Sequence, residues 1–328
     1  KSYAVKLNTP IVIEDREPGM GKVLTRFKLL ALAMDHTYIE NRLAFGILED
    51  IDLMPLFYKF VEFRINGATQ GVYLLVEDPE QYFRENGSEF ILRRGYYNSI
   101  ADAEYEPLFY SIPEETYLTR FREIYALITE LEGPELYDAL SQRINLQQYF
   151  WKMGIDYLIL NGDYTDELFL YADVQLDTVR YQLIPWDYDD IFSSEPHEVG
   201  LTWGTGKLFG TRRYATHQDI LDEIGDKLIY SIEDDLDYII AMDPFLYGRY
   251  EEALSRLFSV LEPTIFDEVF NEIEVELSPF YMNEEVVAQS KFDRDASSFS
   301  LWKDNMRHKQ ELLEERYGQM IKYMDSAK

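Results

Sequence analysis

The chain reads Asn-Gly-Asp-Tyr-Thr-Asp-Glu-Leu-Phe-Leu-Tyr from Asn161 to Tyr171, and Tyr-Gln-Leu-Ile-Pro-Trp-Asp-Tyr-Asp from Tyr181 to Asp189. Residues 168–171 and 179–184 have the composition of β-strands, and residues 172–178 have that of a connecting loop. The stretch therefore predicts a β-hairpin with acidic residues at its open end. If the hairpin folds about residues 175 and 176, Asp163 lies opposite Asp187 and Tyr188.

Two carboxylates that meet at one end of a hairpin repel each other unless a cation or a proton neutralises them. A divalent metal that is bound by these carboxylates and acts on phosphates is one use of such a pair. The alternative is that Asp163 and Asp187 belong to two ordinary acidic turns that flank a strand pair. The spacing of the residues leaves both interpretations open.

Composition limits the classes of function. The 328 residues include no cysteine, which excludes disulfides, thiolate metal sites and a cysteine nucleophile. The formal net charge is −30, which disfavours binding to nucleic acid and to anionic membranes and favours basic protein partners. Apolar runs such as residues 27–34 are too short to span a bilayer. The chain begins at Lys1 without methionine, so the sequence leaves open whether further residues, including a targeting signal, precede it.

The periodicity of apolar residues predicts an α+β fold with a β-rich N-terminal lobe, residues 1–113, and a mainly helical C-terminal lobe, residues 114–328. In the first lobe, Asn66-Gly67 predicts a tight hairpin turn, and Glu77 ends the second strand on the face that carries Tyr73 and Leu75. A carboxylate on an apolar face needs a partner, so Glu77 is either a rim residue or part of a site. The second lobe is predicted to contain helices over residues 117–132, 135–144, 146–160, 220–230, 232–242, 244–261, 264–277 and 295–324.

Four segments in this order resemble the spore coat protein CotH family. They are Lys-Ser-Tyr-Ala-Val-Lys-Leu (1–7), Asn-Arg-Leu-Ala-Phe (41–45), Ile-Asn-Gly-Ala-Thr-Gln-Gly-Val-Tyr-Leu-Leu-Val-Glu (65–77) and Ile-Pro-Trp-Asp-Tyr-Asp (184–189). The resemblance implies an atypical protein-kinase-like fold with the hairpin at its active site. It also implies an activity, the ATP- and Mg²⁺- or Mn²⁺-dependent phosphorylation of Ser or Thr in a secreted, surface or spore-coat protein.

The same resemblance implies roles for individual residues. Asp163 matches the catalytic aspartate that orients the incoming hydroxyl, and Asp187 matches the metal-binding aspartate. Asp189 is either a second metal ligand or a turn residue, and Glu77 matches the acidic residue that closes its strand. Trp186 is interpreted as a packing residue.

Phosphate binding also requires cations, and the candidates are Lys1, Lys6, Arg93 and Arg94. Each of these residues has an ordinary alternative as a solvated side chain on a strand. The four histidines, His36, His197, His217 and His308, are far apart in the sequence, and none is interpreted as a metal ligand.

Two positions depart from the family pattern. The asparagine that usually follows the catalytic aspartate as a metal ligand is replaced here by Asp166 or Glu167, and Glu167 is the candidate ligand. The Arg-Asn pair usual in the first helix is Glu40-Asn41. These departures keep a second hypothesis open, a weak or inactive relative that serves as a surface or coat binding protein. A glycosidase that uses Asp163 and Asp187 as its carboxylate pair is a third, more distant alternative.

Overall fold

The computed structural model of the chain describes residues 2–14, 21–35, 37–86, 88, 90–95, 106–107, 114–163, 168–172, 180–197, 199, 214–290 and 297–326. The chain divides into two compact units. The first contains residues 1–85 and 262–315, and the second contains residues 86–261 and 316–328.

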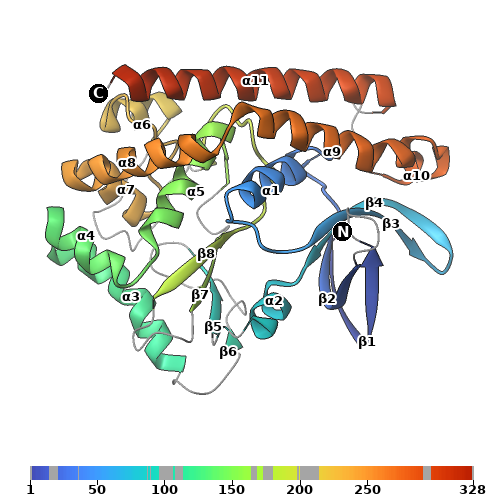
Figure 1. The fold of residues 1–328 in the computed structure, drawn as a ribbon, viewed down its shortest axis with the longest axis horizontal. Helices are drawn as coiled ribbons and strands as arrows, with labels where there is room; N and C mark the ends of the chain where they lie inside the picture. Colours follow the sequence, from blue (N-terminus) through green and yellow to red (C-terminus); the bar gives the residue numbers. More distant parts are fainter. Residues whose placement is uncertain are drawn as a thin grey trace. The chain divides into compact units, whose positions relative to one another are not determined.

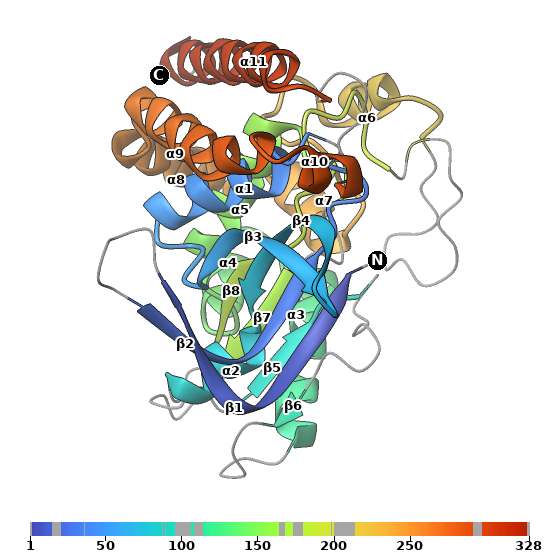
Figure 2. The ribbon, with the colours of Figure 1, turned by 90° about the vertical axis from the view of Figure 1, so that its right-hand side faces the viewer.

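A four-stranded antiparallel sheet forms the centre of the first unit (Figure 1). Its strand order is β1 (Tyr3–Glu14), β2 (Gly21–Leu30), β4 (Ala68–Glu77) and β3 (Tyr58–Ile65). The predicted hairpin turn is confirmed: Ile65 pairs with Ala68, and Asn66 and Gly67 have φ angles of 51° and 84°. Positive φ at both central residues matches the right-handed twist of the two strands. The β1–β2 ribbon is strongly curved (Figure 2).

The first unit also contains helices from both ends of the chain. They are α1 (Glu40–Asp50), α2 (Pro79–Glu85), α9 (Pro263–Tyr281), α10 (Glu284–Gln289) and the first part of α11 (Phe299–Ser326). The guanidinium group of Arg42 is fully buried and donates to Glu272 and Glu276 at 2.7 Å each. A Cβ atom at Gly71 would lie 2.7 Å from the Ser290 backbone, so β4 and the end of α10 pack in direct contact.

The first unit therefore differs from the predicted N-terminal lobe. Residues 262–315, which the sequence placed in the helical lobe of residues 114–328, pack with the N-terminal sheet, and the N-terminal part of the unit ends at residue 85 rather than 113. The apolar stripe of a helix shows that it packs against something, but not against which element.

The second unit combines a second antiparallel sheet with most of the helices. The strand order is β6 (Glu106–Pro107), β5 (Phe90–Arg93), β7 (Leu168–Ala172) and β8 (Tyr181–Pro185). The helices are α3 (Glu114–Glu130), α4 (Gly133–Ser141), α5 (Leu146–Ile159), α6 (His217–Ile224), α7 (Asp235–Met242), α8 (Pro244–Val260) and the end of α11. The expected coarse architecture is confirmed, an antiparallel sheet in the N-terminal region followed by a mostly helical part.

Several helices have different ends from those predicted, and two of these differences have a local cause. Helix α6 ends at Ile224 rather than Tyr230, because Gly225 adopts a φ of 73°. Helix α7 begins at Asp235 rather than Ile232, because the Asp234 side chain caps it by accepting from the Leu236 amide at 2.8 Å. Within the described residues, no helix is long and apolar enough to cross a lipid bilayer.

Candidate active site

The β7–β8 hairpin has a register that differs from the predicted one. Leu168 pairs with Pro185 and Ala172 with Tyr181, so the pairing is centred between residues 176 and 177 rather than 175 and 176. Ahead of this strand pair, the amide of Gly162 bonds to the carbonyl of Asp190 at 2.9 Å. The predicted midpoint of the hairpin was therefore wrong by one residue, because the length of a turn cannot be read from the composition of a polar loop.

Backbone hydrogen bonds hold the segment after α5 against the segment after β8. The amide of Gly162 donates to the carbonyl of Asp190 at 2.9 Å, and the amide of His197 donates to the carbonyl of Gly162 at 2.9 Å. The amides of Phe192 and Ser193 donate to Ile159 and Leu160 at 2.7 and 3.1 Å. These bonds place Asp163 on a short segment fixed to the loop that follows Asp187 and Asp189.

A histidine bridges the two segments at the level of their side chains. The Nδ1 atom of His197 lies 3.5 Å from Asp163 Oδ2, and its Nε2 atom lies 2.6 Å from Asp190 Oδ2. The three side chains are 45%, 40% and 31% exposed, so solvent reaches all of them. The sequence analysis missed His197 and Asp190, since residues 186–197 form a loop without helix or strand periodicity.

Asp187 and Asp189 lie half-buried in the Trp-Asp-Tyr-Asp segment. The residues that alternate with them are buried: Trp186 packs edge-to-face on Phe169 with a centroid distance of 5.5 Å, and Tyr188 is fully buried. The interpretation of Trp186 as a packing residue is confirmed. Its burial and that of Tyr188 anchor the segment that carries the two carboxylates. Asp163, Asp187, Asp189, Asp190 and His197 are called the hairpin-end site below.

The backbone around the hairpin-end site is strained. Of the seven non-glycine residues with positive φ among those described, three lie here: Leu160 (53°), Asp187 (47°) and Phe192 (59°). Aspartate tolerates this conformation better than leucine or phenylalanine, because its short side chain can bond locally. Strained residues of this kind concentrate at functional sites, where the surrounding packing holds them in place.

The acidic residues fit a divalent metal of the magnesium type. Among the described side chains, no three carboxylate or imidazole groups converge as a preformed metal site. Mg²⁺ is usually held by one or two protein carboxylates, with water and substrate phosphates completing its shell. Asp187 and Asp189 satisfy that requirement. The other predicted ligand, Glu167, and its neighbour Asp166 lie outside the described residues.

Glu77 closes β4 in the first unit and is fully buried. Its Oε2 atom accepts from the Phe57 amide at 3.1 Å, and its Oε1 atom lies 2.8 Å from the ammonium group of Lys22. Burial raises the pKa of Glu77, while the Lys22 ammonium opposes that rise. Glu77 is therefore an anchored carboxylate with a cation partner rather than an open rim residue.

The sequence analysis did not single out Lys22, which starts β2 and is 28% exposed. The sheet register places Phe27, not Lys22, opposite Glu77, so strand pairing alone does not predict the ion pair. The ion pair thus joins two residues that are not register partners, and no periodicity in the sequence predicts it.

The predicted phosphate-binding cations have different surroundings. Lys1 lies outside the described residues. Lys6 is exposed on β1 opposite Arg26, and Arg93 is half-buried on β5. Arg94 is only 1% exposed and is enclosed by protein, so in this structure it is not open to a phosphate.

Arg94 instead belongs to a buried network with Tyr125, Tyr149, Asp234 and Asp237. Arg94 donates to the Tyr149 hydroxyl at 2.7 Å and lies 4.0 Å from Asp234. The Tyr125 and Tyr149 hydroxyls donate to Asp234 and Asp237 at 2.9 and 2.6 Å. Burial alone would lower the pKa of Arg94, but Tyr149 and Asp234 raise it well above its usual value. Burial raises the pKa of Asp237 to about 6 against the opposing charge of Arg94.

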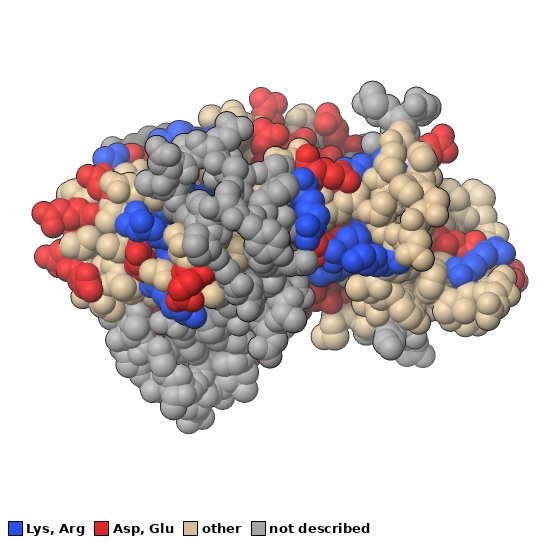
Figure 3. All heavy atoms as spheres, turned by 90° about the horizontal axis from the view of Figure 1, so that it is seen from below, with Lys and Arg blue, Asp and Glu red and all other residues tan. Residues whose placement is uncertain are grey.

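The described residues on the face in Figure 3 carry charges of both signs. On the face in Figure 3, Lys and Arg groups lie among Asp and Glu groups and do not leave a field of one sign. The net charge of −30 therefore describes the chain as a whole and not every face of it.

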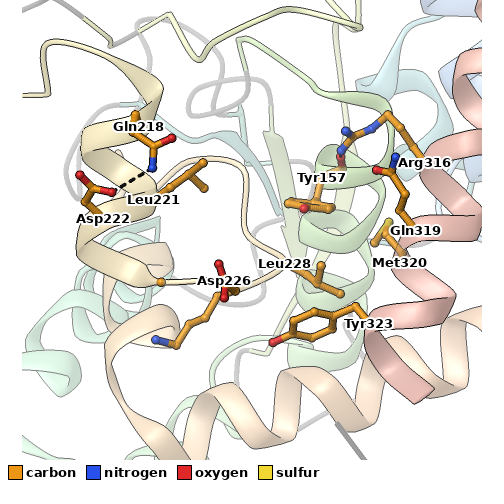
Figure 4. A pocket seen from close by; sticks show the side chains of 12 residues that line it. Tyr157, Gln218, Leu221, Asp222, Asp226, Leu228, Arg316, Gln319, Met320 and Tyr323 are labelled. Carbon is orange, nitrogen blue, oxygen red and sulfur yellow. Dashed lines mark hydrogen bonds between the residues drawn. The ribbon is translucent and has the colours of Figure 1, made fainter. Parts of the chain in front are cut away.

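A pocket of about 650 Å³ opens elsewhere in the second unit, between α6, the end of α5 and the end of α11 (Figure 4). Its lining includes Tyr157, Asp226, Arg316 and Tyr323, and none of the predicted site residues. Arg316 donates to the backbone carbonyls of Tyr157 and Leu158 and lies over the Tyr157 ring at 5.1 Å. Its guanidinium therefore caps the C-terminal end of α5.

The chain was compared with known proteins and with models of protein families. No curated protein sequence matches it. The family model described as CotH kinase protein matches residues 1–326. Since the match spans essentially the whole chain, the protein belongs to the CotH kinase family.

Proposed function

We propose that this chain is an ATP- and divalent-metal-dependent protein serine/threonine kinase of the CotH type with a protein-kinase-like fold. The observation that carries the proposal is the Gly162–Asp190 backbone bond of 2.9 Å. It ties Asp163 to the loop that follows Asp187 and Asp189, so the residues matching the catalytic and metal-binding positions of the family share one anchored site. Family membership supports the same assignment.

In this proposal Asp187 and Asp189 hold Mg²⁺ or Mn²⁺, with Glu167 as a further candidate ligand. The metal, when bound, neutralises the charge of the ATP phosphates. Asp163 orients the hydroxyl of the substrate Ser or Thr and accepts its proton as the bond from oxygen to the γ-phosphorus forms and ADP leaves. Little covalent chemistry is asked of the protein, so the rate depends on how firmly these carboxylates are positioned.

Lys22 is the cation that we propose for the nucleotide phosphates. Its ammonium group is partly exposed and is held 2.8 Å from the buried Glu77 carboxylate. A fixed ammonium binds phosphate at lower entropic cost than a freely moving one. Lys22 replaces Arg94 in this role, because Arg94 is buried, and Lys6 and Arg93 remain secondary candidates.

The proposed substrates are secreted, cell-surface or spore-coat proteins. The family name points to the spore coat. The net charge of −30 favours substrates with basic residues around the Ser or Thr.

Two measurements test the proposal. Calorimetry should detect ATP binding in Mg²⁺ or Mn²⁺ and very little in EDTA, because clustered carboxylates repel a bare triphosphate. Incubation with radiolabelled ATP, the metal and a basic Ser-rich peptide should label the peptide. If ATP bound equally well in EDTA, Asp187 would have no role in metal binding. If neither the peptide nor coat proteins became labelled, the kinase assignment would be wrong.

A non-catalytic surface or coat binding protein is the second candidate. It is favoured by Asp166 and Glu167 at the place of the usual asparagine and by Glu40 at the place of the usual arginine. A protein of this kind would bind coat proteins without metal-dependent ATP binding. The calorimetric titration therefore separates the two candidates.

A further inference from the structure

One glutamine of α2, Gln81, is bonded to the strand that carries Lys22. The Oε1 atom of Gln81 accepts from the backbone amides of Thr25 and Arg26 at 2.8 and 2.7 Å, and from the Thr25 hydroxyl at 2.9 Å. Its Nε2 atom donates to the carbonyl of Val23 at 3.2 Å. Gln81 is only 4% exposed, and burial away from water strengthens such bonds.

These bonds lie where the ladder of the sheet is incomplete. Phe27 pairs with Glu77, the last residue of β4, so residues 21–26 of β2 extend beyond the end of that strand. On the other side of β2, the register with β1 shifts at Thr25. A bulge of this kind disrupts the ladder locally and leaves backbone groups that need other partners. The amide group of Gln81 supplies those partners.

The Lys22 side chain is held from the same segment of the chain. Its ammonium group lies 2.8 Å from the Glu77 carboxylate and 5.9 Å from the centre of the Tyr82 ring. Glu77 ends β4, and Gln81 follows four residues later in α2. Glu77 therefore fixes the tip of the Lys22 side chain, and Gln81 fixes the strand from which this side chain extends.

We propose that Gln81 is a positioning residue for Lys22. The inference rests on the proposed function in one respect, the binding of ATP phosphates by the Lys22 ammonium. Gln81 fastens residues 23–26 of β2 to α2, so the ammonium is already in place when a phosphate arrives. Without this amide group the end of β2 would have to be ordered as ATP binds, and that ordering would lower the affinity for ATP.

Calorimetric titration with ATP and Mg²⁺ in two backgrounds tests the inference. Gln81→Met keeps the length of the side chain and removes its polar atoms. It should weaken ATP binding by about two- to tenfold, the factor that corresponds to ordering one long side chain. Lys22→Met should weaken ATP binding by about tenfold or more. Because Gln81 acts through Lys22, adding Gln81→Met to Lys22→Met should cause no further loss, whereas general damage to the first unit would weaken binding in both backgrounds.

Other variants control for the change of residue type. Gln70 lies on β4 and donates to the carbonyls of Ala68 and Thr69 at 3.3 and 3.1 Å, so Gln70→Met should leave the ATP affinity unchanged. Gln81→Glu keeps an oxygen that accepts from the amides of β2, and it should bind ATP more tightly than Gln81→Met does. If Gln81→Met does not fold, Gln81→Asn takes its place, because its amide group is one methylene too short to reach β2.

Hydrogen exchange tests the contact without ATP. The amides of Thr25 and Arg26 should be protected in the parent protein and should exchange faster in Gln81→Met. Equal exchange in the two proteins, an unchanged ATP affinity in Gln81→Met, or a further loss in the double variant overturns the positioning role. A parent protein that binds no ATP overturns the kinase proposal and the positioning role together, and hydrogen exchange then still shows whether Gln81 fastens β2.

Discussion

Two groups of charged residues in the second unit differ in how their charges are satisfied. In the buried network, Arg94, Asp234 and Asp237 are at most 1% exposed, and two tyrosine hydroxyls donate to the carboxylates. Burial raises the pKa of Asp237 to about 6, so this carboxyl holds a proton more tightly than an exposed aspartate does. The charges of this network are paired within the protein, so we assign it a structural role.

The hairpin-end site has the opposite character. It contains four aspartates and one histidine, and its described side chains are half-buried or exposed. Its four carboxyl groups outnumber its single basic side chain, so the site has an excess of acidic groups. Together with the left-handed backbone at Asp187, this excess favours a cation from solution. The comparison shows that the residues around a carboxylate, more than the carboxylate itself, separate a structural role from a ligand-binding role.

The largest expected effect is on catalysis at the hairpin-end site. Asp163→Asn should lower the phosphotransfer rate by about 10²- to 10⁴-fold, the usual contribution of a general base, while ATP still binds. Asp187→Ala should lose metal-dependent ATP binding as well. Calorimetry and a transfer assay on each variant check this, with Asp226→Asn, an exposed aspartate of the same unit, as the control. Similar profiles for the first two variants would defeat the division of roles.

The buried network should respond through stability instead. Arg94→Met leaves Asp234 and Asp237 without their cation and should lower the free energy of unfolding by about 3–5 kcal/mol. Arg93→Met, a change at the last residue of β5 and next to Arg94, should cost no more than about 1 kcal/mol, because Arg93 is half-buried. Urea unfolding measures both. If the Arg94→Met protein were stable but bound ATP more weakly, Arg94 would be assigned to phosphate binding instead.

The buried network should also make the free energy of unfolding depend on pH. The pKa of Asp237 is raised from 3.8 to about 6 in the folded state, so the folded protein holds this proton more tightly than the unfolded chain does. The resulting stabilisation is fully present below about pH 4 and is lost as the pH rises through about 6, an effect of roughly 3 kcal/mol at most.

Asp237→Asn keeps an acceptor for the Tyr149 hydroxyl and removes the titrating group. The free energy of unfolding of this variant should vary less between pH 4 and pH 7 than that of the parent protein. Asp226→Asn, at an exposed position, should retain the parent profile. Identical profiles for Asp237→Asn and the parent would show that Asp237 does not titrate in this range.

The smallest expected effect concerns the choice of substrate. The net charge of −30 should favour basic over acidic Ser peptides by a few-fold in the transfer rate at low salt. The preference should shrink toward physiological salt, where screening limits the field to about 8 Å. Matched basic and acidic peptides across that salt range test this. The mixed charges in Figure 3 mean that the local potential at the site decides the result, and no salt effect would assign the net charge to solubility.

Local patterns in the sequence predicted much of the architecture. The Asn66-Gly67 turn, the β7–β8 strand pair, the packing role of Trp186 and the positions of most helices were all predicted correctly. These features follow from φ preferences and from periods of 2 and 3.6, which involve only a few neighbouring residues. The ordered motifs also led correctly to the family.

Tertiary structure alone decided the partners of the charged residues. It brought Asp190 and His197 to Asp163, enclosed Arg94 among tyrosines and aspartates, joined Lys22 to Glu77, and packed residues 262–315 against the N-terminal sheet. Each of these contacts depends on the length of a loop, the curvature of a strand or the face on which a helix packs. Such quantities link positions far apart in the chain, so no local pattern of residue types determines them.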